Sequence, residues 1–176
     1  MAIGSRIRPA GYGDIEALVR CATTATTEME EVGFGTRRSE QTFTDPGRLS
    51  AAWQVPGRVG TQEIFVAEME GLVVGYVTLE DRDTELELNT IAVLGSHQGR
   101  GIGSRLVQFV EERARDQGKQ AVTLGTSRNA AGTPWRSFSW WLTHGFRVVG
   151  EEENVWTRAI GPGVREIRMR KEIGPR

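Results

Sequence analysis

The 176-residue sequence has little cysteine, no long apolar run and almost no net charge. Its single cysteine, Cys21, cannot form an internal disulfide, which excludes a disulfide-stapled scaffold and makes a reducing cytoplasm the expected location. No apolar run approaches the length of a transmembrane helix, and the first residues lack the apolar core of a signal peptide, so we expect no membrane association. Lys and Arg total 22 against 23 Asp and Glu, which excludes a broad positive field for nucleic acid.

The remaining composition is that of an ordinary soluble domain. Hydrophobic residues make up 38% and charged residues 26% of the chain. The length allows a sizeable apolar core without metal or disulfide staples. We find no internal repeat, low-complexity tract or linker, so the sequence predicts one domain over residues 1–176, and we expect no metal site.

The segment Ile91–Arg105, IAVLGSHQGRGIGSR, has the pattern of an anion-binding loop. An apolar strand pattern ends at Val93, and an amphipathic helix pattern begins near Ile102. The first turn of a helix leaves backbone N–H groups without partners and carries partial positive charge, so it attracts anions. Three residues without Cβ would let a phosphate approach the backbone, namely Gly99, Gly101 and Gly103.

Periodicity and turn residues predict the elements around this loop. The first half reads as a strand at 3–9, a helix at 15–27 with Asp14 as its N-cap, and a helix at 45–54. Residues 28–60 otherwise form either a wall over a site or a connector, and their aromatic residues are expected to pack locally: Phe34, Phe43 and Trp53. An antiparallel meander of three strands then spans 63–93.

After the loop, the pattern predicts a helix ending near Gly118, a parallel strand at 121–127, a tryptophan-rich helix at 135–144, and strands at 145–153 and 164–173. The arginines of the last strand, Arg168 and Arg170, are expected on a solvated face. Strict alternation divides the strand before the loop into two faces. One carries Leu86, Leu88, Thr90 and Ala92, and the other carries Glu87, Asn89, Ile91 and Val93.

Three families of phosphate loop can be compared with this sequence. A Walker loop needs a lysine after its last glycine, which Gly103-Ser104-Arg105 lacks. A dinucleotide loop needs GxGxxG near the start of a βαβ unit, whereas the glycines here have the spacing GxGxG and follow a meander of three strands. Gln98–Gly103, QGRGIG, matches the Q/R-x-x-G-x-G/A signature, and the chain therefore resembles the GNAT acyltransferases. His144-Gly145-Phe146 is similar to the GF of their second CoA-contacting segment, and the element order agrees over nearly the whole chain.

The resemblance implies an α/β fold with a central mixed, mostly antiparallel sheet of about seven strands, flanked by helices and splayed at the acetyl-CoA site, with a motif core over residues 63–150. It implies acetyl-CoA as acyl donor, which agrees with the anion-site argument. The residues that the resemblance assigns to CoA are Ile91, Ala92, Val93, Gln98, Gly99, Arg100, Gly101, Ile102, Gly103, Ser104, Asn129 and Trp141.

The same resemblance implies direct attack of an amine on the thioester. Glu87, six residues before Val93, matches the place of the glutamate base in the family's histone-modifying branch. Partial burial would raise the pKa of this carboxyl towards working pH, as a base requires, and the alternative is a glutamate on the strand face that lies in solvent or in a salt bridge. Glu85 and Asn89 lie two positions to either side, and either could orient the amine or a water.

Two positions depart from the family pattern. Trp141 stands where many members carry a tyrosine near the CoA sulfur, and an indole N–H cannot serve as an acid. Ser137, Ser139 or water could replace it, and His144 is expected to be structural. The connection after Asn129 is longer than usual.

The sequence thus predicts an N-acetyltransferase that moves the acetyl group of acetyl-CoA to a primary amine of a small molecule or peptide. A non-catalytic acyl-CoA-binding module of the same fold is the alternative. The sequence does not identify the acceptor, and it is compatible with a homodimer.

Overall fold

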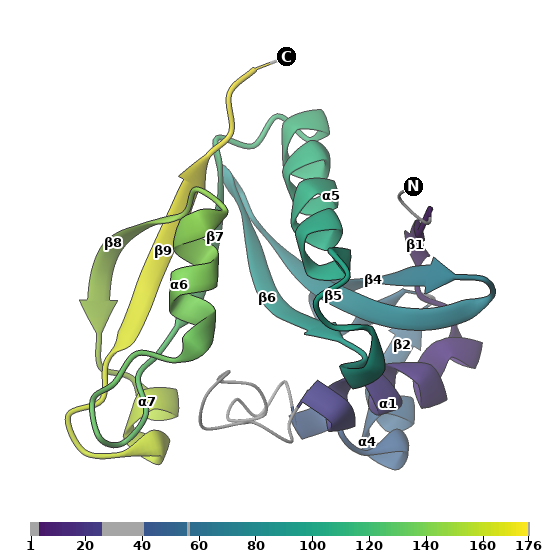
Figure 1. The fold of residues 1–176 in the computed structure, drawn as a ribbon, viewed down its shortest axis with the longest axis horizontal. Coiled ribbons are helices and arrows are strands. Elements are labelled where there is room, and N and C mark those ends of the chain that lie inside the picture. Colours follow the sequence, from purple (N-terminus) through teal and green to yellow (C-terminus); the bar gives the residue numbers. More distant parts are fainter. Residues whose placement is uncertain (1–3, 26–40, 56, 176) are drawn as a thin grey trace.

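The computed structural model describes residues 4–25, 41–55 and 57–175. These residues form a mixed α/β fold built on one nine-stranded sheet, in the order β2-β3-β4-β5-β6-β7-β9-β8, with β1 paired to β4 (Figure 1). The pairing of β6 with β7 is parallel and the other pairings of this sheet are antiparallel. The predicted fold class is confirmed, and the short strands β2 and β3 account for the higher strand count.

The strands are β1 Arg6–Pro9, β2 Trp53–Val55, β3 Arg58–Val59, β4 Gln62–Met69, β5 Leu72–Arg82, β6 Glu85–Val93, β7 Ala121–Thr126, β8 Arg147–Glu152 and β9 Glu166–Glu172. The helices are η1 Tyr12–Asp14, α1 Ile15–Ala25, α4 Pro46–Ala52, η3 Gly95–His97, α5 Ile102–Asp116, α6 Arg136–Thr143 and α7 Val155–Ile160. The sequence patterns did not predict α7. Within the described ranges, no helix has both the length and the apolarity to cross a membrane.

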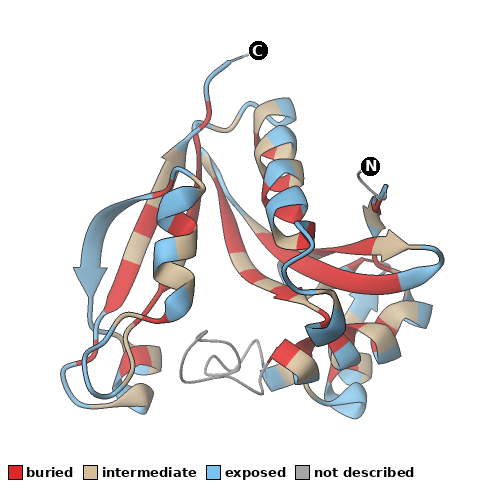
Figure 2. Cartoon of the chain, viewed as in Figure 1, coloured by how far each residue is buried: buried red, intermediate tan, exposed pale blue. Residues whose placement is uncertain are grey.

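Helices cover both faces of the sheet and create two apolar cores. The larger core lies under α5 and α6, and the second lies under α1 and α4 (Figure 2). Each helix contributes one apolar stripe, as its spacing predicts: α5 buries Leu106, Val107, Val110 and Ala114, and α1 buries Leu18, Cys21 and Ala22. Gly118, with φ of 68°, follows the end of α5 as predicted.

The start of α1 differs from the prediction. Asp14 does not cap α1 but belongs to η1, where its carboxylate accepts a hydrogen bond of 2.7 Å from the N–H of Gly11. The Arg8 guanidinium also donates to both Asp14 oxygens, at 2.7 and 2.9 Å, and this contact lowers the pKa of Asp14. The Asp14 carboxylate therefore binds Arg8 of β1 and the N–H of Gly11, and it does not act as the N-cap of α1.

A β-bulge at Asn89 interrupts the alternation of β6. Leu88 and Thr90 pair with consecutive residues of β5, which leaves Asn89 as an extra residue. Leu88 consequently packs in the core under α5, whereas Ala92 packs in the core under α1. The prediction that these two share a face is therefore wrong, because a bulge shifts the two-residue period by one.

The segment predicted as a wall or connector is described only in part. Residues 26–40, which include Phe34 and the last turn predicted for the first helix, lie outside the described residues. Phe43 is buried and stacks on Tyr76, with ring centroids 5.1 Å apart. Its predicted local packing is confirmed. The predicted start of α4 is also correct, because the Asp45 carboxylate accepts from Arg48 N at 2.8 Å.

Cys21 should be unreactive in the folded protein. It lies fully buried on α1, and burial raises the pKa of its thiol to about 11. A thiol of that pKa offers almost no nucleophilic thiolate at neutral pH. Titration with Ellman's reagent is expected to detect no thiol in the native protein and one per chain after unfolding. Rapid labelling of the native protein would contradict this placement.

Candidate active site

The two halves of the sheet separate between β6 and β7. Their parallel pairing covers only Glu85–Glu87 of β6 and Ala121–Thr123 of β7, and beyond it the strands diverge (Figure 1). A cavity of about 780 Å³ opens at this point. This is the splay that the resemblance predicted, and the break in pairing leaves edge groups of both strands available to a ligand.

Most residues predicted to bind CoA line this cavity. They come from the end of β6, the glycine loop, the first turn of α5 and α6: Ile91, Ala92, Val93, Gln98, Gly99, Gly101, Ile102, Gly103, Ser104 and Trp141. Arg100, Asn129 and Glu87 do not line it. Trp135 of the loop before α6 also lines the cavity, and so does Trp156 of α7, which the sequence did not assign to the site.

The three loop glycines serve two different purposes. Gly99 and Gly101 have φ of 74° and 80°, a region that favours glycine, and a Cβ at either position would meet open space. Gly103 is helical, and there a Cβ would lie 3.2 Å from Cζ2 of Trp140. The loop therefore fits an anion at its first two glycines, while the third lets a tryptophan of α6 pack against α5.

Replacing Gly101 with alanine is expected to strain the loop. Alanine in the left-handed region costs about 1–2 kcal/mol. Gly13→Ala is the matched control, because Gly13 has an ordinary φ and open space around its Cβ position. Urea unfolding of both variants measures the difference. Equal stability of the two variants would show that the loop does not require this conformation.

Two polar side chains organise the loops around the cavity. Gln98 donates from Nε2 to the carbonyl of Val93 at 3.2 Å and so ties the loop to the end of β6. Asn129, predicted to contact CoA, instead accepts through Oδ1 from the N–H groups of Ala131 and Thr133, at 3.1 and 3.0 Å. Its side chain thus closes the turn after β7.

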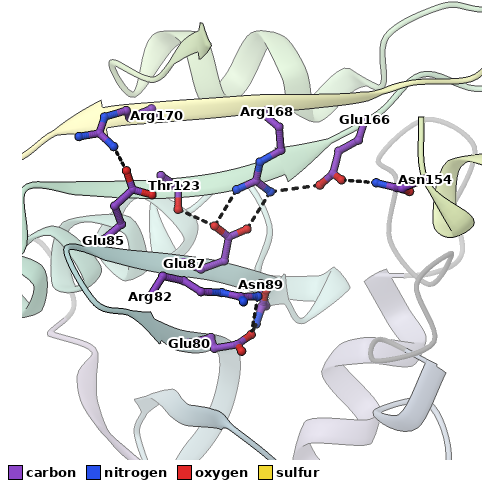
Figure 3. A network of polar contacts seen from close by, with 10 residues as sticks. All are labelled: Glu80, Arg82, Glu85, Glu87, Asn89, Thr123, Asn154, Glu166, Arg168 and Arg170. Carbon is purple, nitrogen blue, oxygen red and sulfur yellow. Dashed lines mark hydrogen bonds and ion pairs between the residues drawn. The ribbon is translucent and has the colours of Figure 1, made fainter. Parts of the chain in front are cut away.

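Glu87 is buried in an ion pair beside the cavity. Arg168 of β9 donates to both of its carboxylate oxygens, at 2.9 and 2.8 Å, and the hydroxyl of Thr123 donates at 2.5 Å (Figure 3). The residue is only 5% exposed. Such a bidentate contact between guanidinium and carboxylate is among the stronger polar contacts in proteins.

The ion pair continues to α7. Arg168 also donates to Glu166 at 3.2 Å, and Glu166 accepts from Asn154 Nδ2 at 2.6 Å (Figure 3). Asn154 caps α7 by accepting from Thr157 N at 3.0 Å. The network therefore joins the splay to the helix that carries Trp156.

The prediction of a solvated face is wrong for Arg168. Burial lowers its pKa, but the hydrogen bonds and charges of Glu87 and Glu166 outweigh burial and raise the pKa overall. Arg170 makes a similar ion pair with Glu85, and its Nε also donates to Glu172 at 2.8 Å. Alternation along β9 placed both arginines on one face, but the sequence alone could not show that β6 presents carboxylates to that face.

Asn89 is the polar side chain of the bulge and lines the cavity. Its Nδ2 donates to Glu80 on β5 at 3.1 Å (Figure 3). Since a carboxylate only accepts, this contact fixes the amide orientation and leaves Oδ1 as the group that can accept from a ligand.

Trp141 takes the place of the family tyrosine. It is 5% exposed, packs against Phe146 with centroids 5.3 Å apart, and touches the cavity. Ser137, one turn earlier, lies 3.4 Å from the hydroxyl of Thr126, and both line the cavity. Ser139 donates to the carbonyl of Arg136 at 3.1 Å. Both serines line the cavity, but the partner of Ser137 is a second hydroxyl, whereas that of Ser139 is a backbone carbonyl of its own helix.

A search for related proteins identifies the family. The model of the acetyltransferase (GNAT) family matches residues 25–133, more than half of the chain. The chain belongs to this family. The match contains the strand, glycine loop and helix from which the resemblance was predicted, so the predicted family is confirmed. It ends before α6, so it does not include Trp141.

Individual relatives agree with this assignment. Human N-acetyltransferase 8B is 34% identical over 103 residues, which are 54% of this chain and 44% of that protein, so the chain spans less than half of that relative. A PaiA N-acetyltransferase from Thermoplasma acidophilum in complex with coenzyme A superposes with a TM-score of 0.69 at 15% identity, over 96% of this chain and 99% of that one. A GNAT family acetyltransferase from Elizabethkingia anophelis with acetyl-CoA bound gives 0.54 at 21% identity, over 64% and 76%. At these identities the two structures show a shared fold.

Proposed function

We propose that this protein transfers the acetyl group of acetyl-CoA to a primary amine of a small molecule or peptide within a ternary complex. The observation that carries the proposal is the cavity of about 780 Å³ at the splay, bounded by the glycine loop and by the first turn of α5. Family membership supports acetyl transfer in general. The amine nitrogen attacks the thioester carbon, the carbon–sulfur bond breaks, and the nitrogen loses a proton.

Donor binding is assigned to the glycine loop and the end of β6. The open space at Gly99 and Gly101 is the fit expected for a pyrophosphate approaching the backbone. Both glycines directly precede α5, whose macrodipole favours an anion at its N-terminus. Bound acetyl-CoA would supply an activated acyl group and a thiolate leaving group. Residues 91–93 line the cavity where a pantetheine arm would run along the unpaired edge of β6.

Asn89 is proposed to orient the acceptor. Because its Nδ2 donates to Glu80, its Oδ1 is the atom that would accept a hydrogen bond from the attacking amine. That hydrogen bond would align the nitrogen lone pair with the thioester, and such alignment lowers the barrier of a direct transfer. The bulge aims this side chain at the cavity, and bulges commonly act so next to active sites.

Ser137 and Thr126 are proposed to assist the leaving group. Their hydroxyls lie together on the cavity wall one turn from Trp141. A hydroxyl donates a hydrogen bond to a developing thiolate, which lowers the barrier without requiring an acid of low pKa. The thiolate would then take its proton from solvent.

Glu87 was predicted as the base, and its surroundings favour a positioning role. Arg168 donates to both of its oxygens, and Glu87 does not line the cavity. To take the amine proton directly, the carboxylate would have to weaken this ion pair. We therefore propose that Glu87 positions Arg168 and β9, and that water accepts the proton from the amine.

The experiment measures melting temperature with and without acetyl-CoA, followed by thiol release with a panel of primary amines. A ligand at a hundred times its Kd stabilises by about 2.7 kcal/mol, a shift of several degrees for a domain of this size. No shift at saturating acetyl-CoA would overturn the proposal. A shift without thiol release on any amine would favour a non-catalytic acyl-CoA-binding module, the alternative that Trp141 keeps open.

A further inference from the structure

The C-terminal end of α6 contacts the first turn of α5 through a histidine. His144 Nε2 lies 2.9 Å from the hydroxyl of Ser104, the third residue of α5. Ser104 lines the cavity. The neighbouring Trp140 packs on Gly103 and on the His144 ring, with centroids 4.0 Å apart. Trp140 of α6 and its C-cap residue His144 therefore both contact the first turn of α5.

The orientation of the imidazole is fixed by its own helix. Nδ1 lies 2.8 Å from the carbonyl of Trp140, and a carbonyl only accepts. Nδ1 therefore carries a proton in the neutral ring, and Nε2 accepts from the hydroxyl of Ser104. In this state the hydroxyl proton points at His144, and the serine presents lone pairs to the cavity.

An anion at this turn would reverse that arrangement. A phosphate oxygen needs a donor, so the Ser104 hydroxyl would have to turn its proton toward the cavity. The serine oxygen would then accept from Nε2, which requires a second proton on the ring.

We propose that His144 and Ser104 together recognise the pyrophosphate of the donor, and that His144 takes up one proton from solvent when this anion binds. The proposal rests on the proposed function and adds a positioning residue that the family signature does not contain. The donor is thereby held through a relay: imidazolium to Ser104 hydroxyl, and Ser104 hydroxyl to phosphate oxygen.

The charged groups on neighbouring elements are engaged elsewhere. Arg105 of α5 donates from Nε to the carbonyl of Ser5 at 3.1 Å. Lys171 of β9, which lies beside Gly145, pairs with Glu111 of α5 at 2.5 Å. The other histidine, His97, lines the cavity from η3 and contacts the hydroxyl of Ser96 at 2.9 Å. His97 is therefore the group to test as a rival source of proton uptake.

The test is calorimetric titration of CoA at pH 7.5 in two buffers of different ionisation enthalpy, which counts the protons taken up. The wild type is expected to take up a measurable fraction of one proton. His144→Gln should abolish the uptake and weaken CoA about fivefold at pH 6.5, with less effect at pH 8.5. Ser104→Ala should also abolish the uptake and weaken CoA binding to the same extent. The double variant should lose no more affinity for CoA than either single variant. His97→Gln should keep the uptake.

A second ligand separates recognition from general damage to the fold. S-acetyl-pantetheine lacks the pyrophosphate, so its use as acyl donor should be equal in the wild type, His144→Gln and Ser104→Ala. Proton uptake that survives His144→Gln, or that disappears in His97→Gln, would overturn the proposal. Equal losses with both donors would also overturn it. If the wild type fails to bind CoA at all, the proposed function itself fails.

Discussion

Replacing Arg168 with methionine is expected to be the most destabilising single change among the polar residues of the site. Methionine keeps much of the side-chain volume but removes the cation between two buried carboxylates, Glu87 and Glu166. Breaking a buried pair costs about 3–5 kcal/mol. Arg168 is 28% exposed, so solvent screening reduces the expected loss to about 2–4 kcal/mol.

Urea unfolding measures this loss, with Arg147→Met as the matched control. Arg147 also pairs with a glutamate, Glu172, but its side chain is 63% exposed. Such a surface pair contributes less than about 1 kcal/mol. If the two variants are equally stable, the buried network does not hold β6 to β9 as the structure indicates.

Replacing Glu87 with glutamine is expected to change stability more than the chemical step. The amide keeps the shape of the side chain but turns one acceptor into an N–H group that faces the guanidinium of Arg168. An unmatched donor of this kind costs about 1–3 kcal/mol. For kcat we expect a loss below about tenfold, against the 10²–10⁴-fold that removal of a general base typically costs.

Unfolding curves and initial rates on the same preparation separate the two roles. Acetyl-CoA should bind the variant as it binds the wild type, because Glu87 does not line the cavity. The rate comparison needs a reactive amine from the panel, measured from pH 6 to 9. A loss above a hundredfold at neutral pH, with unchanged stability, would restore Glu87 as the base and refute its positioning role.

The donor side of the site could be predicted from the sequence because its signals are local. A strand, a glycine turn and a helix follow one another in Ile91–Arg105, and the groups that bind an anion there are backbone N–H groups. Gly99 and Gly101 have the positive φ that a glycine permits. The structure brings these residues together at one cavity, where we propose that the donor binds.

The acceptor side could not be predicted in the same way. One extra residue, Asn89, moved Ala92 to the opposite face of the sheet from Leu88, and a bulge has no reliable signal in a single sequence. The partner of Glu87 lies 81 positions away on β9, where Arg168 had the pattern of a solvated cation. Contacts between residues so far apart in the sequence depend on the order of the strands in the sheet.

The sequence by itself determined the family, the fold class and the loop to which we assign the donor, because periodicity and glycine chemistry act over a few residues. The tertiary structure alone decided that Glu87 is held by Arg168, that Asn89 faces the cavity, and that His144 rests on the anion turn. The physical reason is that a side chain's charge and hydrogen bonds depend on what lies opposite it. The antiparallel pairing of β9 with β7 places Arg168, and the contact of His144 with Ser104 joins the end of α6 to the first turn of α5.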